Sequence, residues 1–148
     1  MKWSWLYQVV RVALGALFIY AAVGKILQPA EFAREVDNYR LLPYGAVVLT
    51  AVVLPWLELL CGVGLIVRRW ARGSALLVVI MLGVFTAALV SALGRGLDIS
   101  CGCFALSGEA SKVSLLRVLE DCVMLAAAVW VWWKEEARAN QVRAGTAT

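Results

Sequence analysis

The stretch GSALLVVIMLGVFTAALVSAL, residues 73–93, contains no charged side chain and is long enough to cross a bilayer. A helix rises about 1.5 Å per residue, so about 20 apolar residues cover the hydrocarbon core. Further stretches of similar length and composition occur at residues 6–27, 45–67 and 113–133. Because lipid offers no partner to backbone N–H and C=O groups, each must be helical. The sequence therefore predicts an all-α integral membrane protein, a four-helix antiparallel bundle.

The composition indicates little mass outside the membrane. Of 148 residues, 63% are hydrophobic and 16% charged, against roughly 45–50% and about 25% in soluble domains. We interpret residues 1–148 as one four-span domain with an outward loop at 94–112 and a solvated, frayed cytoplasmic tail at 134–148. The chain has no histidine, which excludes histidine-ligated haem or zinc and histidine-dependent catalytic pairs. Its net charge of +4 is scattered around the spans, so we expect a lipid bilayer and no nucleic acid as partner.

Basic residues and tryptophans indicate the orientation. Four spans place both termini on one side, and the segments on that side carry seven basic residues against four on the other. The positive-inside rule then places the termini in the cytoplasm. Six of the seven tryptophans fall at the same boundary, where an amphipathic indole is favoured. We therefore predict a multi-pass protein of a bacterial inner (cytoplasmic) membrane, with residues 28–44 and 94–112 facing outward.

The outward loop contains the motif Ser100-Cys101-Gly102-Cys103-Phe104. Cys101 and Cys103 can form a disulfide if the backbone bends, and Gly102 tolerates the dihedral angles that this requires. A strained ring of this kind has a raised reduction potential and exchanges readily. Cys101 and Cys103 are therefore candidate catalytic residues, with soft-metal binding or no function as alternatives. Cys61 and Cys122 lie inside spans at different depths, and we interpret them as packing residues that do not pair.

Several ionisable residues fall inside the predicted spans, where each is costly unless it is paired or faces water: Arg11, Lys25, Glu58, Arg117, Glu120 and Asp121. Similar depths predict an ion pair between Arg11 and Glu58. Arg117, Glu120 and Asp121 share one helix face, so Lys25 and Arg117 are expected to meet Glu120 or Asp121 beneath the Cys-Gly-Cys loop. Two roles stay open for these charges: registering the helices, or delivering protons and binding partner headgroups.

Several blocks of the chain together carry a resemblance to a known family. The chain resembles the DoxX-like group of small membrane proteins, most closely its MauE branch, through Arg11-Val-Ala-Leu-Gly15, Gly24-Lys25, Asn38-Tyr39-Arg40-Leu41-Leu42-Pro43, Leu54-Pro55-Trp56-Leu57-Glu58 and Cys101-Gly102-Cys103-Phe104. The resemblance covers nearly everything from Arg11 to Trp133. It implies a redox-associated inner-membrane protein, the namesake being linked to maturation of the disulfide-rich small subunit of methylamine dehydrogenase.

Three functions are compatible with these observations. The leading hypothesis is thiol-disulfide exchange through Cys101 and Cys103 with an extracytoplasmic thioredoxin-fold or disulfide-containing partner, making the chain a candidate thiol-disulfide oxidoreductase. The electrons need an acceptor; a quinone in the bundle could serve by analogy with other four-helix disulfide enzymes, although no feature of the sequence fixes a quinone site. The alternatives are a soft-metal-binding membrane carrier and a noncatalytic membrane scaffold for a partner enzyme.

Overall fold

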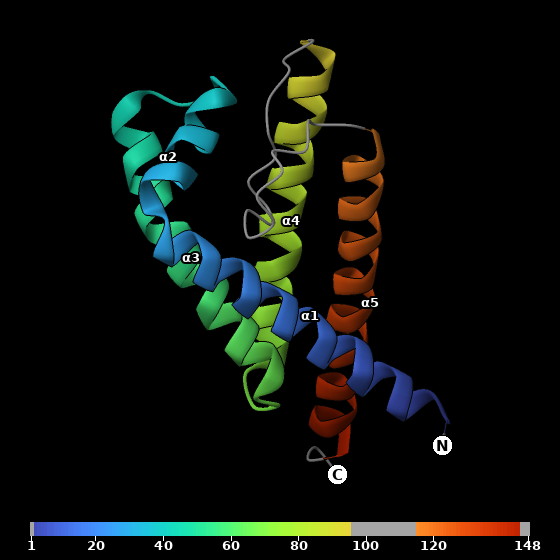
Figure 1. Cartoon of the computed structure of the whole chain (residues 1–148). Helices are drawn as coiled ribbons and strands as arrows, with labels where there is room; N and C mark the ends of the chain where they lie inside the picture. The colour runs from blue at the N-terminus through green and yellow to red at the C-terminus, as the bar shows by residue number, and fades with distance from the viewer. Residues whose placement is uncertain (1, 96–114, 146–148) are drawn as a thin grey trace.

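The computed structural model describes residues 2–95 and 115–145, with side chains for residues 5–95, 118–141 and 144. These residues form helices only: α1 (Lys2–Leu27), α2 (Pro29–Asn38), α3 (Tyr44–Ile66), α4 (Ala71–Gly94) and α5 (Leu115–Gly145). The predicted all-α class is confirmed for this part of the chain. In Figure 1 the start of α1 and the end of α5 lie at one end of the molecule, which we call the terminal end. Helix α2 lies at the opposite end, which we call the α2 end.

Three helices are long and apolar enough to cross a membrane: Trp5–Leu27 within α1, Tyr44–Ile66 and Ala71–Gly94. The protein is therefore a multi-pass membrane protein. The 31-residue α5 is long enough, but Arg117, Glu120 and Asp121 make its first half more polar, and it is not among these three. Helices α4 and α5 pack side by side and antiparallel, whereas α1 runs diagonally in Figure 1. A four-helix antiparallel bundle is thus not confirmed, and α5 as a fourth span stays a prediction.

The expected outward loop at 28–44 contains the ten-residue helix α2, which the sequence interpretation missed. Pro29 occupies the first helical turn, where its missing N–H costs nothing. Phe32 is buried, while Glu31 and Arg34 on the other side of the helix are exposed. A helix this short and amphipathic cannot span a bilayer but suits its surface, so a search for long apolar runs passes over it.

The tail beyond Trp133 is also more ordered than expected, because α5 continues as a helix to Gly145. This stretch consists largely of good helix formers. It is also tied to the other helices: Arg72 of α4 donates to both carboxylate oxygens of Glu136, at 2.7 and 2.8 Å. The prediction of a frayed segment directly after Trp133 is therefore wrong for residues 134–145.

Helices α1 and α3 pack most extensively, and they approach closely where Gly15 faces Gly62. A Cβ added to either glycine would lie 2.8 Å from the carbonyl oxygen of the other, closer than real Cβ atoms come. Small residues at such a crossing allow two membrane helices to bring their backbones together. Buried residues surround the crossing and join it to α4 and α5: Leu14, Phe18, Cys61, Leu65, Val78, Leu82 and Val131.

Candidate functional site

The Cys101-Gly102-Cys103 motif lies outside the described residues, as does the side chain of Arg117. Among the described residues, α4 ends at Gly94 and is followed by Arg95, and α5 begins at Leu115. In Figure 1 these two ends lie away from the terminal end. The end of α4 and the start of α5, between which the motif lies in the sequence, are thus both on the side opposite the termini.

Arg95, at the base of this loop, is fixed to the turn between α2 and α3. Its Nη2 donates a hydrogen bond of 2.7 Å to the carbonyl oxygen of Tyr39, and its Nε donates to Ser91 O at 3.2 Å. Tyr39 is itself buried, and its ring meets Phe85 of α4 edge to face, with centroids 6.3 Å apart. The two segments predicted to face outward are thus joined through one arginine.

Glu58 forms an ion pair with Lys25, and the predicted Arg11–Glu58 pair is wrong. Lys25 Nζ lies 2.5 Å from Glu58 Oε1, and both side chains are about nine-tenths buried, with 11% and 10% of their surface exposed. The Lys25 ammonium also lies 5.0 Å from the ring centre of Phe32. Lys25 pairs with Glu58 because both lie on the same side of the point where α1 crosses α3 at Gly15 and Gly62, namely the side nearer α2.

Arg11 lies on the terminal side of the same crossing and closes the end of α3. Its Nη1 donates to the carbonyl oxygens of Leu65 and Ile66, the latter at 3.1 Å. The last carbonyls of a helix have no partner within the helix and carry the negative end of its dipole. The buried Arg11 guanidinium therefore supplies hydrogen bonds to these carbonyls and a positive charge to the negative end of the helix dipole. Arg11 Nε and Glu58 Oε2 are buried and find no hydrogen-bond partner among the described residues.

Asp121 is buried between α5 and α4, where it hydrogen bonds with Thr86. The Thr86 hydroxyl is also 2.8 Å from the carbonyl oxygen of Leu82, one turn earlier. Since Lys25 binds Glu58, the predicted contact of Lys25 with Asp121 or Glu120 is wrong. Glu120 lies on the exposed side of α5. The acidic groups of α5 and the Lys25–Glu58 pair are thus separate features.

The two described cysteines are both free thiols, as predicted. Cys61 is buried beside the α1–α3 crossing, in agreement with a packing role. Cys122 is exposed and lines an apolar groove of about 580 Å³ on α5, so its interpretation as a packing residue within the chain is wrong. The helix phase of Cys122, one residue after the buried Asp121, turns it outward.

A polar cluster at the terminal end was missed by the sequence interpretation. The Tyr7 hydroxyl donates to Glu135, and Arg138 lies 3.7 Å from the same carboxylate. The Arg138 guanidinium also stands 4.4 Å from the Tyr7 ring centre, and Tyr7 meets Trp130 edge to face at 6.1 Å. These contacts hold α1 against α5. No spacing rule reveals them, because the two partners lie at opposite ends of the chain.

Glu35 of α2 lies outside the spans and is close enough to Lys25 to interact with it electrostatically. Burial raises the pKa of the Glu35 carboxyl above its ordinary value, because it penalises the charged form; Lys25 acts in the opposite direction and Glu31 adds to the increase. At the α2 end, the buried Lys25 thus interacts with two carboxylates, those of Glu58 and Glu35.

Comparison with known proteins assigns the chain to a family. The family model described as "Methylamine utilisation protein MauE" matches residues 3–134. The chain belongs to the MauE family. The resemblance noted in the sequence is thereby confirmed.

Proteins named methylamine utilization protein MauE are similar to this MauE-family chain. The one from Paracoccus denitrificans is 40% identical over 120 residues, which cover 80% of this chain and 64% of that protein. The one from Methylophilus methylotrophus is 32% identical over 112 residues, 75% of this chain and 59% of that protein. The chain thus spans less than two thirds of the length of these curated relatives. No solved structure matches it.

Proposed function

We propose that this MauE-family protein exchanges disulfides with an extracytoplasmic partner through Cys101 and Cys103, with Gly102 between them. The observation that carries the proposal is the Cys-Gly-Cys motif in the sequence between α4 and α5. Membership of a family named for methylamine utilisation supports a role in that metabolism, and the partner we propose is a disulfide-containing protein of it.

One round of the proposed exchange conserves atoms and electrons without a cofactor. A partner thiolate attacks the loop disulfide and forms a mixed disulfide, and the second partner thiolate then displaces the loop cysteine. Two electrons and two protons pass from the partner dithiol to the loop, which becomes a dithiol. Repeated turnover needs an oxidant for the loop, and a membrane quinone is the chemical class we propose.

The apolar groove on α5 does not suit such a quinone. It is lined by Cys122, tryptophans and aliphatic side chains and presents almost no polar surface to hydrogen bond the quinone oxygens. No step of the proposed exchange is therefore assigned to this groove.

The proposed orientation, with both termini cytoplasmic, follows from the distribution of basic residues. Arg68 and Arg69 lie in the exposed turn between α3 and α4, at the terminal end. A cysteine introduced in place of Arg69 should react with a permeant thiol reagent but not with an impermeant reagent added from outside. Reaction with the impermeant reagent would reverse the proposed orientation.

The exchange is tested by trapping. In Cys103→Ser the Cys101 thiolate should attack the disulfide of the oxidised partner, which is the reverse of the exchange above. The resulting mixed disulfide should accumulate in intact cells as a reducible species, because Cys103 is no longer there to release the partner. Cys101→Ser/Cys103→Ser should abolish both the trapped species and partner oxidation, whereas Cys61→Ser and Cys122→Ser serve as matched controls and should change neither.

Other results of these experiments would support the two alternative functions, a scaffold or a metal carrier. Unchanged partner oxidation in the double variant would support the scaffold role and reject exchange. A soft metal ion bound in a ratio of one per chain and lost in the double variant would support the carrier role.

A further inference from the structure

The turn between α2 and α3 forms an open pocket that plays no part in the proposed exchange. It has a volume of about 430 Å³ and is lined by Asp37, Asn38, Arg40, Leu41 and Leu42. We call it the α2–α3 pocket. It combines one acidic, one amide and one basic side chain with two leucines.

The backbone of the α2–α3 pocket is held in a conformation that its sequence does not favour. Arg40 has φ of 49°, in the left-handed region, where glycine is the usual residue after a helix end. The turn is nevertheless fixed: Arg40 N–H donates to Asp37 O at 2.9 Å, and Arg95 holds the carbonyl of Tyr39. The backbone that carries Arg40 is thus held by hydrogen bonds at a position where glycine would be less strained. Backbone strain of this kind is common at functional sites.

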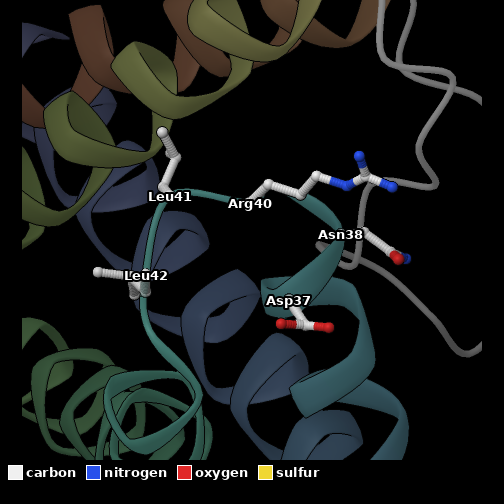
Figure 2. A pocket seen from close by; sticks show the side chains of 5 residues that line it. All are labelled: Asp37, Asn38, Arg40, Leu41 and Leu42. Carbon is white, nitrogen blue, oxygen red and sulfur yellow. The ribbon is translucent and has the colours of Figure 1, made fainter.

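The two charges of the pocket do not neutralise each other. Figure 2 shows the Arg40 guanidinium and the Asp37 carboxylate pointing in different directions from the turn. Neither side chain has an ion-pair or hydrogen-bond partner among the described residues. A ligand that carries a negative and a positive group would complement both, with the Asn38 amide able to hydrogen bond either.

The surroundings of the pocket suit a phospholipid. Leu42 lies two residues before α3, a candidate membrane span, so the pocket is at the level where a bilayer presents its headgroups. Leu41, Leu42 and Tyr44 are 49%, 42% and 81% exposed. These side chains would contact water unless lipid covers them, and a tyrosine at this level is typical of a membrane interface.

We propose that the α2–α3 pocket binds the headgroup of a zwitterionic aminophospholipid such as phosphatidylethanolamine. The Arg40 guanidinium binds the phosphate, as its planar donors match phosphate oxygens. The Asp37 carboxylate accepts a hydrogen bond from the primary ammonium, which phosphatidylcholine cannot donate. Leu41 and Leu42 contact the first carbons of the acyl chains.

The test measures lipid preference on the purified full-length chain. The chain in detergent receives equimolar phosphatidylethanolamine and phosphatidylcholine with the same acyl chains, and native mass spectrometry gives the ratio of bound lipids. We expect a preference of about tenfold for phosphatidylethanolamine, the effect of one charge-assisted hydrogen bond. Asp37→Asn should bring the ratio near one, and Arg40→Gln should lower binding of both lipids. Arg34→Gln, an exposed arginine of α2, is the matched control and should keep the preference.

A second variant separates lost binding from lost folding. Arg40→Gly removes the guanidinium but relieves the left-handed backbone, so its melting temperature without lipid should equal or exceed that of the parent chain while lipid binding falls as in Arg40→Gln. A parent ratio near one, or a ratio that survives both Asp37→Asn and Arg40→Gln, would overturn the proposal. Displacement of the lipid by an equal concentration of glycerophosphoethanolamine would also overturn it, because the site would then recognise a free soluble headgroup.

Discussion

The buried pair Lys25–Glu58 gives the sharpest test of the packing of α1 on α3. Replacing Glu58 by methionine leaves the Lys25 ammonium about nine-tenths buried without its ion-pair partner, and replacing Lys25 by methionine does the same to the Glu58 carboxylate. Breaking one side of a buried ion pair costs about 3–5 kcal/mol. For a chain of this size, each kcal/mol shifts the melting temperature by about 2–4 °C, so each single variant should melt roughly 6–20 °C lower.

The double variant Lys25→Met/Glu58→Met should recover much of this loss, since no unpaired charge remains. Circular dichroism in detergent yields the four melting curves and the coupling energy, which should be about 3 kcal/mol or more, because the double variant should lose less stability than either single variant. Arg11→Met/Glu58→Met is the control, because Arg11 donates to backbone carbonyls of α3 instead; its two losses should add within about 0.5 kcal/mol. Additive losses for Lys25 and Glu58, or equal coupling of Arg11 to Glu58, would refute the observed arrangement.

Three further predictions concern the same helices and α2. Gly62→Ala should separate α1 from α3 and destabilise the protein by more than 1 kcal/mol, roughly the lower range for overpacking, whereas Gly73→Ala, with nothing within 4 Å, should be neutral or stabilising in the same melting assay. Arg11→Met should cost about 1–3 kcal/mol because it leaves the last carbonyls of α3 unsatisfied, and Arg11→Lys should restore part of this; equal stability of the three chains would contradict the capping role. Burial raises the pKa of Glu35, so the folded chain binds its proton more tightly than the unfolded chain, and stability should fall as pH rises through the folded pKa. Glu35→Gln should flatten this fall in melting curves recorded from about pH 4 to 7, and an unchanged slope would exclude Glu35 as its source.

The long apolar helices were predictable because lipid imposes a length and a composition on any segment that crosses it. Residues 45–67 and 73–93 agree closely with α3 and α4. The same criterion could not reveal α2, whose ten residues are amphipathic. It also could not show that α5 continues past Trp133, because that extension is held by contacts with distant parts of the chain.

The buried charges were easier to find than to pair. Arg11, Glu58 and Asp121 are buried, as their position within apolar segments predicted. The partner of each charge depends on where two helices cross. Counting residues from the membrane surface treats the helices as parallel, and the sequence does not reveal where they cross. Arg11 and Glu58 therefore seemed close in depth although Gly15 and Gly62 lie between them. Arg40 shows a second limit, since no local rule predicts an arginine where helix ends favour glycine.

The contacts of Arg11 and Lys25 also bear on how the protein enters the membrane during its synthesis. Both cations belong to α1, and the groups that bind them, Glu58 and the last carbonyls of α3, are made some thirty to fifty residues later. Until then α1 carries two charges that hydrocarbon does not tolerate. We therefore expect α1 to wait at the insertion machinery or in contact with water until α3 emerges, and the two helices to enter the lipid as a pair.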